Sequence, residues 1–260
     1  MRPYDIPRGG RGFRLCPNQR EQGQEPLLHD RAMRLIACLN TYNEIELLPR
    51  CLRALRGVAD LVIAVDGAYR GFPAERPASD DGTWQLLQRV EHASPEWLRA
   101  VRAPRDFWPN QEIKRNAYLR QADALAREGD WLLQVDADEI VLTECGLNEF
   151  LCVTRADCVF VTMQDHDERG PVGAASLLGK VYRWSPGLRY GEEHWLLHRA
   201  DGGLLWGPRE MLRPESCADW PHFRLAHLSG SRSPERQAAK SRFAEFMARS
   251  REQHRVSNPV

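Results

Sequence analysis

The segment DWLLQVDADE, residues 130–139, joins an apolar run to three carboxylates within four residues. Residues 130–138 are expected to form a strand, because WLLQV is short and continuously apolar. Side chains two residues apart on an extended chain point the same way, so Asp136 and Asp138 could together hold a hard cation. The alternative is an acidic turn or a helix cap at the strand end, which would be favoured for an isolated Asp-x-Asp pattern.

The chain before this segment alternates short apolar runs with helical stretches. The expected strands are 35–39, 61–66 and 97–103, and the expected helices are 46–57, 83–92 and 111–129. Continuously apolar strands that alternate with helices indicate an α/β fold, in which helices cover both faces of a mostly parallel sheet. Ligands of such sheets bind beyond the carboxyl ends of the strands, which places residues 41–44, Asp66 and residues 136–139 around one crevice.

The later part of the chain has a different pattern. Antiparallel strands are expected at 158–165 and 177–184, followed by a hairpin of HWLLHR and GLLWG joined by Ala-Asp-Gly. A terminal helix is expected to begin at Ser233, because Ser-Pro suits a helix start. Residues 1–30 are rich in Arg, Gly, Pro and Gln without an apolar period, so they are expected to form a disordered tail.

Composition limits the classes of partner. Lys plus Arg and Asp plus Glu both number 36, so no whole-molecule field favours nucleic acid or a membrane. The basic terminal helix leaves peripheral membrane contact open, although a solvated helix face is favoured. The seven Cys contain no Cys-x-x-Cys pair, which favours reduced thiols over a zinc site. The sequence carries no signal-peptide core and no long apolar run, so we expect a cytoplasmic protein.

Five ordered motifs carry a family resemblance: CLNTYNEIELLPRCLRAL, AVDGAYRG, SDDGT, IKRNAYLRQA and GDWLLQVDADEIV. In this order they resemble the nucleotide-diphospho-sugar transferase fold, GT-A, and within it glycosyltransferase family 2, especially short bacterial members of lipopolysaccharide-core glucosyltransferase type. The resemblance covers residues 34–142 well and 179–245 more loosely. It implies a Rossmann-like sheet with an antiparallel C-terminal extension. The stretch GAYRGFPAERPA, which follows Asp66, departs from the family pattern.

The resemblance implies a function and a division of the chain. The function is that of an inverting, hexosyltransferase-like enzyme that moves a sugar from a nucleotide-diphosphate donor, with a UDP-sugar favoured, to an acceptor hydroxyl. The acceptor stays open among a saccharide, a lipid-linked saccharide and another hydroxyl compound. Residues 31–230 would form the transferase domain, with a nucleotide-sugar-binding half at 31–142 and an acceptor half at 143–230. Residues 231–260 would form the terminal helix and tail.

The same resemblance implies a donor site. Its expected residues are Thr41, Tyr42, Glu44, Asp66, Lys114, Arg115, Asn116 and Asp136. The first three would line the base and ribose, and Asp66 would meet the base. The basic helix start suits a diphosphate, since Arg offers a planar fork and Lys a mobile point charge.

A divalent cation, Mn²⁺ or Mg²⁺, is the implied cofactor. Its expected ligands are Asp136, Asp138, His194 and His227, and oxygen-rich ligand sets suit these ions. The cation would stabilise the charge that develops on the departing diphosphate. For each His, an ordinary structural role is the favoured alternative.

The acceptor hydroxyl needs a general base on the opposite face of the sugar, because its pKa lies far above neutral. Glu193 is the first candidate and Glu192 the second, since the segment YGEEHW resembles a region of the family that carries a His-Glu pair. Asp165, at the end of an expected strand, is the reserve candidate.

Two alternatives stay open. A sugar-phosphate nucleotidyltransferase of the same fold would usually carry a Gly-rich loop after the first strand, which NTYNEIELLPR lacks. A catalytically degenerate module would retain the donor site without turnover, and only activity distinguishes it.

Overall fold

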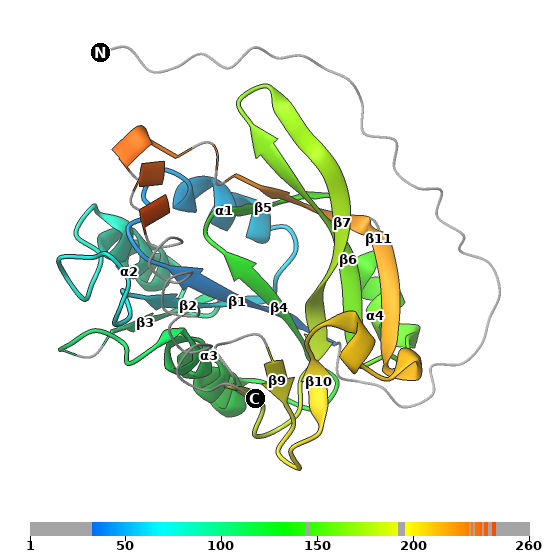
Figure 1. The fold of residues 1–260 in the computed structure, drawn as a ribbon. Helices are drawn as coiled ribbons and strands as arrows, with labels where there is room; N and C mark the ends of the chain where they lie inside the picture. The colour runs from blue at the N-terminus through cyan, green and yellow to red at the C-terminus, as the bar shows by residue number, and fades with distance from the viewer. Residues whose placement is uncertain are drawn as a thin grey trace, which may run out of the picture. The chain divides into compact units, whose positions relative to one another are not determined.

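The computed structural model describes residues 33–103, 105–143, 146–191, 196–228, 230, 232–235, 237–238 and 241–242 (Figure 1). The expected tail at 1–30, the residues Glu192, Glu193 and His194, and most of the terminal helix lie outside these ranges. The expected helix start is confirmed, because Pro234 and Glu235 are helical and the Gln237 N–H donates to the Ser233 carbonyl at 2.9 Å. None of the described helices is long and apolar enough to cross a membrane.

The elements follow one another in an α/β order. The strands are β1 (Leu35–Thr41), β2 (Leu61–Asp66), β3 (Leu98–Arg102), β4 (Trp131–Asp136), β5 (Glu139–Thr143), β6 (Cys158–Asp167), β7 (Gly170–Arg183), β8 (Arg189–Gly191), β9 (Leu196–His198), β10 (Leu204–Trp206) and β11 (Cys217–His227). The helices are α1 (Leu48–Leu55), α2 (Thr83–Ala93), α3 (Gln111–Leu125) and α4 (Leu147–Val153), with short 3-10 turns η1 (Arg209–Met211) and η2 (Pro214–Ser216).

The main sheet confirms the expected mostly parallel core with an antiparallel extension. Its eight strands lie in the order β3-β2-β1-β4-β7-β6-β11-β5, and β8, β9 and β10 form a separate antiparallel sheet. The first four strands are parallel to one another. Strand β7 pairs antiparallel with both β4 and β6. Strand β11 runs parallel to β6, a pairing that the strand pattern did not predict.

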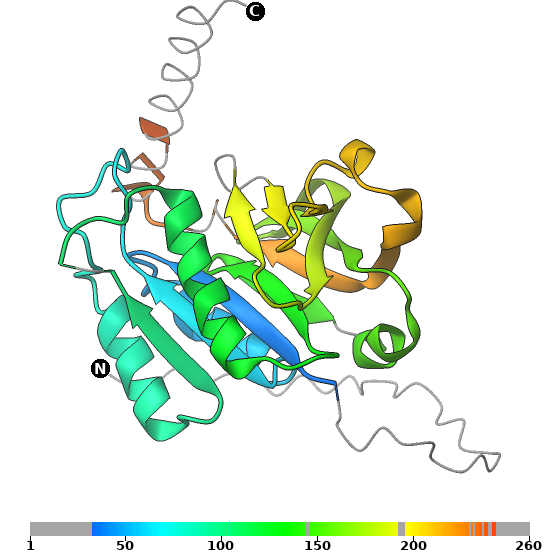
Figure 2. The ribbon, with the colours of Figure 1, turned by 90° about the horizontal axis from the view of Figure 1, so that it is seen from below.

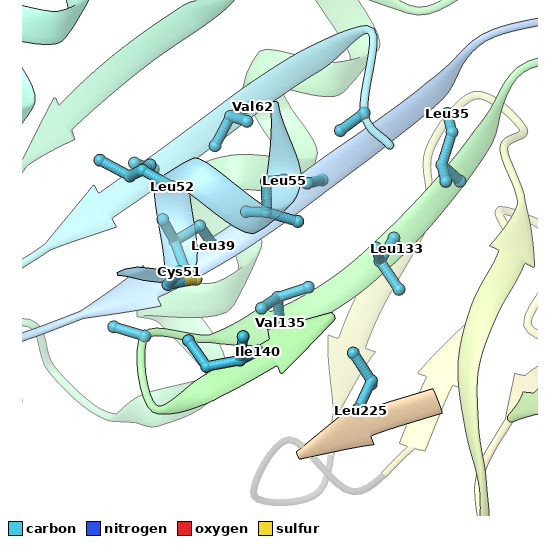
Figure 3. Close-up of a cluster of buried hydrophobic side chains, with 14 of the residues drawn as sticks. Leu35, Leu39, Cys51, Leu52, Leu55, Val62, Leu133, Val135, Ile140 and Leu225 are labelled. Carbon is cyan, nitrogen blue, oxygen red and sulfur yellow. The ribbon is translucent and has the colours of Figure 1, made fainter. Parts of the chain in front are cut away.

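Two apolar layers cover the faces of the sheet, because successive strand residues point to opposite sides. Leu35, Leu39 and Leu133 face the layer that contains α1, α2 and α4, shown in part in Figure 3. Ile36 and Leu132 face the opposite layer, which contains α3 and the small sheet. Figures 1 and 2 show α1 and α3 on opposite sides of β1 and β4.

The helices form where apolar spacing and caps favour them. In α1 the buried residues Leu48, Cys51, Leu52 and Leu55 recur at helical spacing, and a Pro stands in the first turn. The side chain of Asn110 caps α3 by accepting the Ile113 N–H at 2.7 Å. This cap fixes the start of the helix that carries the expected diphosphate-binding residues.

Strand β4 ends two residues earlier than the sequence pattern suggested. Ala137 and Asp138 form a turn instead of continuing the strand, and β5 starts at Glu139. The turn is held because the Asp136 N–H donates to the Glu139 carboxylate at 3.1 Å. Asp136 and Asp138 therefore do not lie on one extended strand, and the rule that side chains two residues apart point the same way does not apply to them. Each carboxylate contacts its own set of partners.

Candidate functional site

A pocket of about 230 Å³ opens beyond the carboxyl ends of β1, β2 and β4. Strand β1 lies between β2 and β4, and the helices that follow β1 and precede β4 cover opposite faces, so this edge is the switch point where α/β sheets bind ligands. The residues that line the pocket are Asn40, Thr41, Tyr42, Glu44, Gly67, Ala68, Tyr69, Phe72, Gln111, Lys114, Asp136, Ala137, Asp138, His227 and Arg232. Seven of the residues expected from the sequence are among them.

Asp136 ends β4 with a fixed orientation. Its register partner on β1 is Asn40, whose side-chain amide donates to the Asp136 carboxylate at 3.1 Å. Arg115 of α3 donates to both carboxylate oxygens, at 3.1 and 3.3 Å. Burial alone would raise the pKa of Asp136, but Arg115 and then Lys180 outweigh it and hold the pKa below its usual value. Asp136 is therefore anionic at neutral pH and already paired with a cation.

Asp138 lies in the turn after β4 and faces residues from the far end of the chain. Its Oδ2 atom lies 3.1 Å from His227 Nε2 and 2.9 Å from Arg232 Nη2. The backbone brings them together, because the Leu228 N–H donates to the Asp138 carbonyl at 2.7 Å. The side chain of Asp138 is 4% exposed, and the Arg232 guanidinium offsets the cost of burying its charge.

Lys114 is a buried cation at the pocket wall. It is 2% exposed, and its Nζ donates to the Thr41 carbonyl at 2.7 Å. Burial lowers the pKa of Lys114 to about 8, although the nearby Asp66 carboxylate works in the opposite direction. A ligand with negative charge would favour the charged form further, so Lys114 is suited to a phosphate.

Three residues expected to bind the donor do not line the pocket. Asp66 is fully buried and accepts hydrogen bonds from Thr41, at 3.1 Å, and from both the backbone and the hydroxyl of Ser79. Arg115 lies behind Asp136. Asn116 exchanges two hydrogen bonds with the backbone of Tyr190, at 2.7 and 3.1 Å. Their contacts support the walls of the pocket, and a direct role in donor binding stays a prediction for each.

An aromatic wall comes from the stretch that departs from the family pattern. Tyr69 and Phe72 lie in this stretch and line the pocket together with Tyr42. The Phe72 ring centroid is 5.5 Å from that of Tyr42 and 5.6 Å from that of Tyr69. Gly67 starts the stretch at φ 121°, where a Cβ atom would lie 2.6 Å from Ala103 Cβ. These rings offer stacking surfaces of the kind that bind a nucleoside base.

Two charged residues that the sequence analysis did not single out complete the site. Lys180 of β7 donates to Glu139 at 2.6 Å, with both side chains buried, and Glu139 in turn holds the Asp136 backbone. Arg232 joins Glu44 and Asp138. A lone Lys in the apolar stretch LLGKVYRW was a usable signal for the first. Arg232 stands among many basic residues, which left no signal for the second.

Of the candidate general bases, only Asp165 falls within the described residues. Its side chain is 72% exposed, and its Oδ1 atom lies 2.7 Å from Nδ1 of His227. This contact fixes the ring so that Nε2 faces Asp138 Oδ2. Asp165 thus orients His227, in the manner of a carboxylate behind a metal-binding histidine. Its role as a base stays a prediction.

The pair of Asp138 and His227 suits a divalent cation. Two ligands about 2.1 Å from a cation and at right angles to each other are roughly 3 Å apart, close to the 3.1 Å between Oδ2 and Nε2. Mn²⁺ and Mg²⁺ sites commonly use one or two protein ligands and take the rest from phosphate and water. Within the described ranges no group of three or more His, Cys, Asp or Glu residues is arranged to hold a metal.

Comparison with known proteins gives partial likenesses. No known family profile matches the sequence. Two uncharacterized proteins, from Mycobacterium tuberculosis and Mycobacterium bovis, are each 30% identical in an alignment that covers 66% of this chain and 44% of the relative. The chain therefore spans less than half the length of these curated relatives.

The solved structures to which the chain is similar include glycosyltransferase-like folds at low sequence identity. S. aureus TarS (residues 1–349) gives a TM-score of 0.47 at 16% identity, covering 82% of this chain and 65% of that chain. The same protein in complex with UDP-GlcNAc gives 0.40 at 22% identity, covering 54% and 37%. GalNAc-T7 with UDP, GalNAc and Mn²⁺ gives 0.45 at 12% identity, covering 77% and 44%. At these TM-scores the likeness assigns no activity.

Proposed function

We propose that this chain is an inverting glycosyltransferase that moves a sugar from a nucleotide-diphosphate donor to an acceptor hydroxyl with the help of a divalent cation. One observation carries the proposal: a single pocket at the switch point of the sheet combines an aromatic wall, a buried Lys and a carboxylate–histidine pair. These are the groups that a base, a diphosphate and a cation respectively require.

The lining of the pocket favours one orientation of the donor. The base would lie against Tyr42, Tyr69 and Phe72, and the diphosphate would extend toward Lys114 and the 136–139 turn. Asp138 and His227 would hold the cation, which supplies positive charge to the departing diphosphate when bound. Asp136 is held by Arg115 and Asn40 at the edge of the same space, where it would contact the donor sugar or the cation.

The reaction is a direct displacement. A carboxylate takes the proton from the acceptor hydroxyl, and the resulting oxygen attacks the anomeric carbon on the face opposite the diphosphate. The bond from that carbon to the diphosphate oxygen breaks, and the nucleoside diphosphate leaves with the electron pair. Glu193 is our first candidate for the base, with Glu192 second. Asp165 is third, because it already orients His227.

The test begins with donor binding. UDP-, GDP-, CMP- and dTDP-sugars are screened by thermal shift with and without Mn²⁺, since a ligand that binds only the folded state raises the midpoint. UDP-GlcNAc comes first, because it is present in one of the similar solved structures. The expected result is a rise for one nucleotide that requires the cation. Folded protein that responds to no donor would overturn the proposal.

Transfer is then tested with base variants. Glu193→Gln should bind the donor as the wild type does and lose release of nucleoside diphosphate by about a hundredfold or more. Asp165→Asn is the matched variant, and its main effect should fall on cation affinity. Unchanged turnover in Glu193→Gln, with a loss in Asp165→Asn that persists at saturating Mn²⁺, would transfer the base role to Asp165.

A further inference from the structure

Arg232 is a buried cation at the edge of the pocket, five residues after β11. Its Nε and Nη2 atoms donate to the two carboxylate oxygens of Glu44, at 3.2 and 2.6 Å, and Nη2 also lies 2.9 Å from Asp138 Oδ2. The side chain is only 8% exposed. The segment is anchored nearby, because the Ser233 N–H donates to the Glu46 carboxylate at 3.1 Å.

One nitrogen of this guanidinium is left over. Nη1 of Arg232 is buried and has no hydrogen-bond partner among the described residues, while the side chain lines the pocket. A buried donor without a partner is costly and rare in folded proteins. An N–H group of a buried cation, placed at the wall of a ligand pocket, is suited to an anionic oxygen.

The Arg232 guanidinium shares its charge between two carboxylates. Its Nη2 atom faces both Glu44 Oε1, at 2.6 Å, and Asp138 Oδ2, at 2.9 Å. The same Oδ2 atom of Asp138 also faces Nε2 of His227. A divalent cation bound between Asp138 and His227 would stand close to Nη2 of Arg232 and repel it.

We propose that Arg232 is a donor-site residue that exchanges partners when the cation binds. Without the cation, Arg232 neutralises Asp138. With the cation, its contact to Asp138 breaks, Glu44 keeps hold of the guanidinium, and the freed N–H groups bind the diphosphate of the donor. This inference rests on the proposed function, since it takes the diphosphate as the ligand of the pocket.

The exchange predicts opposite effects on two affinities in Arg232→Met. Binding of Mn²⁺ alone, measured by electron paramagnetic resonance of the free ion, should strengthen by about tenfold, because the competing cation is gone. Binding of UDP or GDP at saturating Mn²⁺, measured by calorimetry, should weaken by about tenfold or more, because a charged hydrogen-bond donor is lost. Arg209→Met, which removes an exposed ion pair with Asp219 outside the pocket lining, should change neither affinity.

A purely structural role for Arg232 predicts a different result. If Arg232 only fastens the chain segment, Arg232→Met lowers the thermal midpoint and weakens Mn²⁺ binding or leaves it unchanged, which overturns the exchange. Arg232→Lys serves if the Met variant fails to fold: it keeps a charge but loses the fork, so diphosphate binding should fall by about fivefold at an unchanged midpoint. Wild-type protein that binds Mn²⁺ but no nucleoside diphosphate would instead overturn the proposed function.

Discussion

The chain before residue 144 and the chain after residue 145 reach the same pocket in different ways. In the first half, residues 33–143, the pocket residues stand at the ends of parallel strands or at the start of α3, as Thr41, Asp136 and Lys114 do. The second half consists of the described residues from 146 to 242. There, the pairing of β11 with β5 and β6 brings His227 and Arg232 to the pocket. Local sequence order therefore positions the pocket residues of the first half, and long-range strand pairing positions those of the second half.

The difference separates two tasks. The first half supplies the aromatic wall and the buried Lys, which suit the nucleotide. The second half supplies partners for Asp138, which suit the cation and its charge balance. If this division holds, variants in the two halves should be distinguishable by which ligand they affect.

The largest expected effect concerns a buried ion pair between the halves, Lys180 with Glu139. Lys180→Met should lower the free energy of unfolding by about 3–5 kcal/mol, because it leaves the buried Glu139 carboxylate without its cation. Urea denaturation measures it. Replacing both partners, in Glu139→Leu/Lys180→Met, should recover part of the loss. Arg70→Met, which breaks an exposed pair with Asp106, is the control. If the free energy of unfolding falls no more than in the control, this ion pair does not stabilise the contact between the halves.

The next effect compares one cation ligand from each half. Asp138→Asn should weaken UDP binding at fixed Mn²⁺ by about a hundredfold, and His227→Gln by about tenfold. Losses of metal affinity of about 10- to 100-fold are typical when residues around a metal site are changed. Calorimetry at several Mn²⁺ concentrations measures both. Asp219→Asn, on an exposed carboxylate, provides the reference. If only the Asp138 variant loses affinity, the second half does not contribute a ligand and the division of tasks fails.

The smallest effect depends on pH and on the first half alone. The pKa of Lys114 is about 8 in the folded protein, and a bound diphosphate favours the charged form. Donor affinity should therefore be constant below pH 8 and fall above it, by at most about tenfold per pH unit. In Lys114→Met the affinity should be lower and independent of pH over this range. Equal pH profiles for the two proteins would remove Lys114 from the donor site.

For Lys114, a rise in pH is expected to change the stability of the protein in the opposite direction to its effect on donor affinity. The folded pKa of Lys114 lies below its ordinary value of 10.5, so the unfolded chain binds more protons between these values. The contribution of Lys114 to stability is unfavourable below about pH 8 and is relieved as the pH rises toward 10.5. A charged side chain that is costly to bury and is placed at a pocket wall is typical of a functional residue.

The parts of the site that follow local order could be predicted from the sequence. Asp136 and Asp138 stand after an apolar strand, and Lys114 stands one turn into a helix with a cap. The strand alternation also gave the parallel sheet and its carboxyl edge. The strand end was wrong by two residues, because the Glu139 contact that turns the chain is not visible in a pattern of apolar residues.

The parts that depend on pairing could not be predicted. Nothing in the sequence around Arg232 marks it as the partner of Glu44. The burial of Asp66 beneath Ser79 depends on how the twelve-residue stretch GAYRGFPAERPA folds over Asp66. The parallel pairing of β11 with β6 contains a register shift between Trp220 and Arg224, which no strand pattern encodes.

The turn at Ala137 and Asp138 also bears on how the protein folds. It connects β4 and β5, which lie fourth and eighth in the sheet, with β7, β6 and β11 between them. Neighbouring strands are spaced about 4.8 Å apart, so a two-residue link between such distant positions requires the sheet to curl back on itself. Asp138 immediately precedes β5 and His227 ends β11, so the two side chains meet when β5 pairs with β11, a pairing between distant parts of the sequence. A ligand that needs both side chains therefore binds only to a chain in which this long-range pairing has formed.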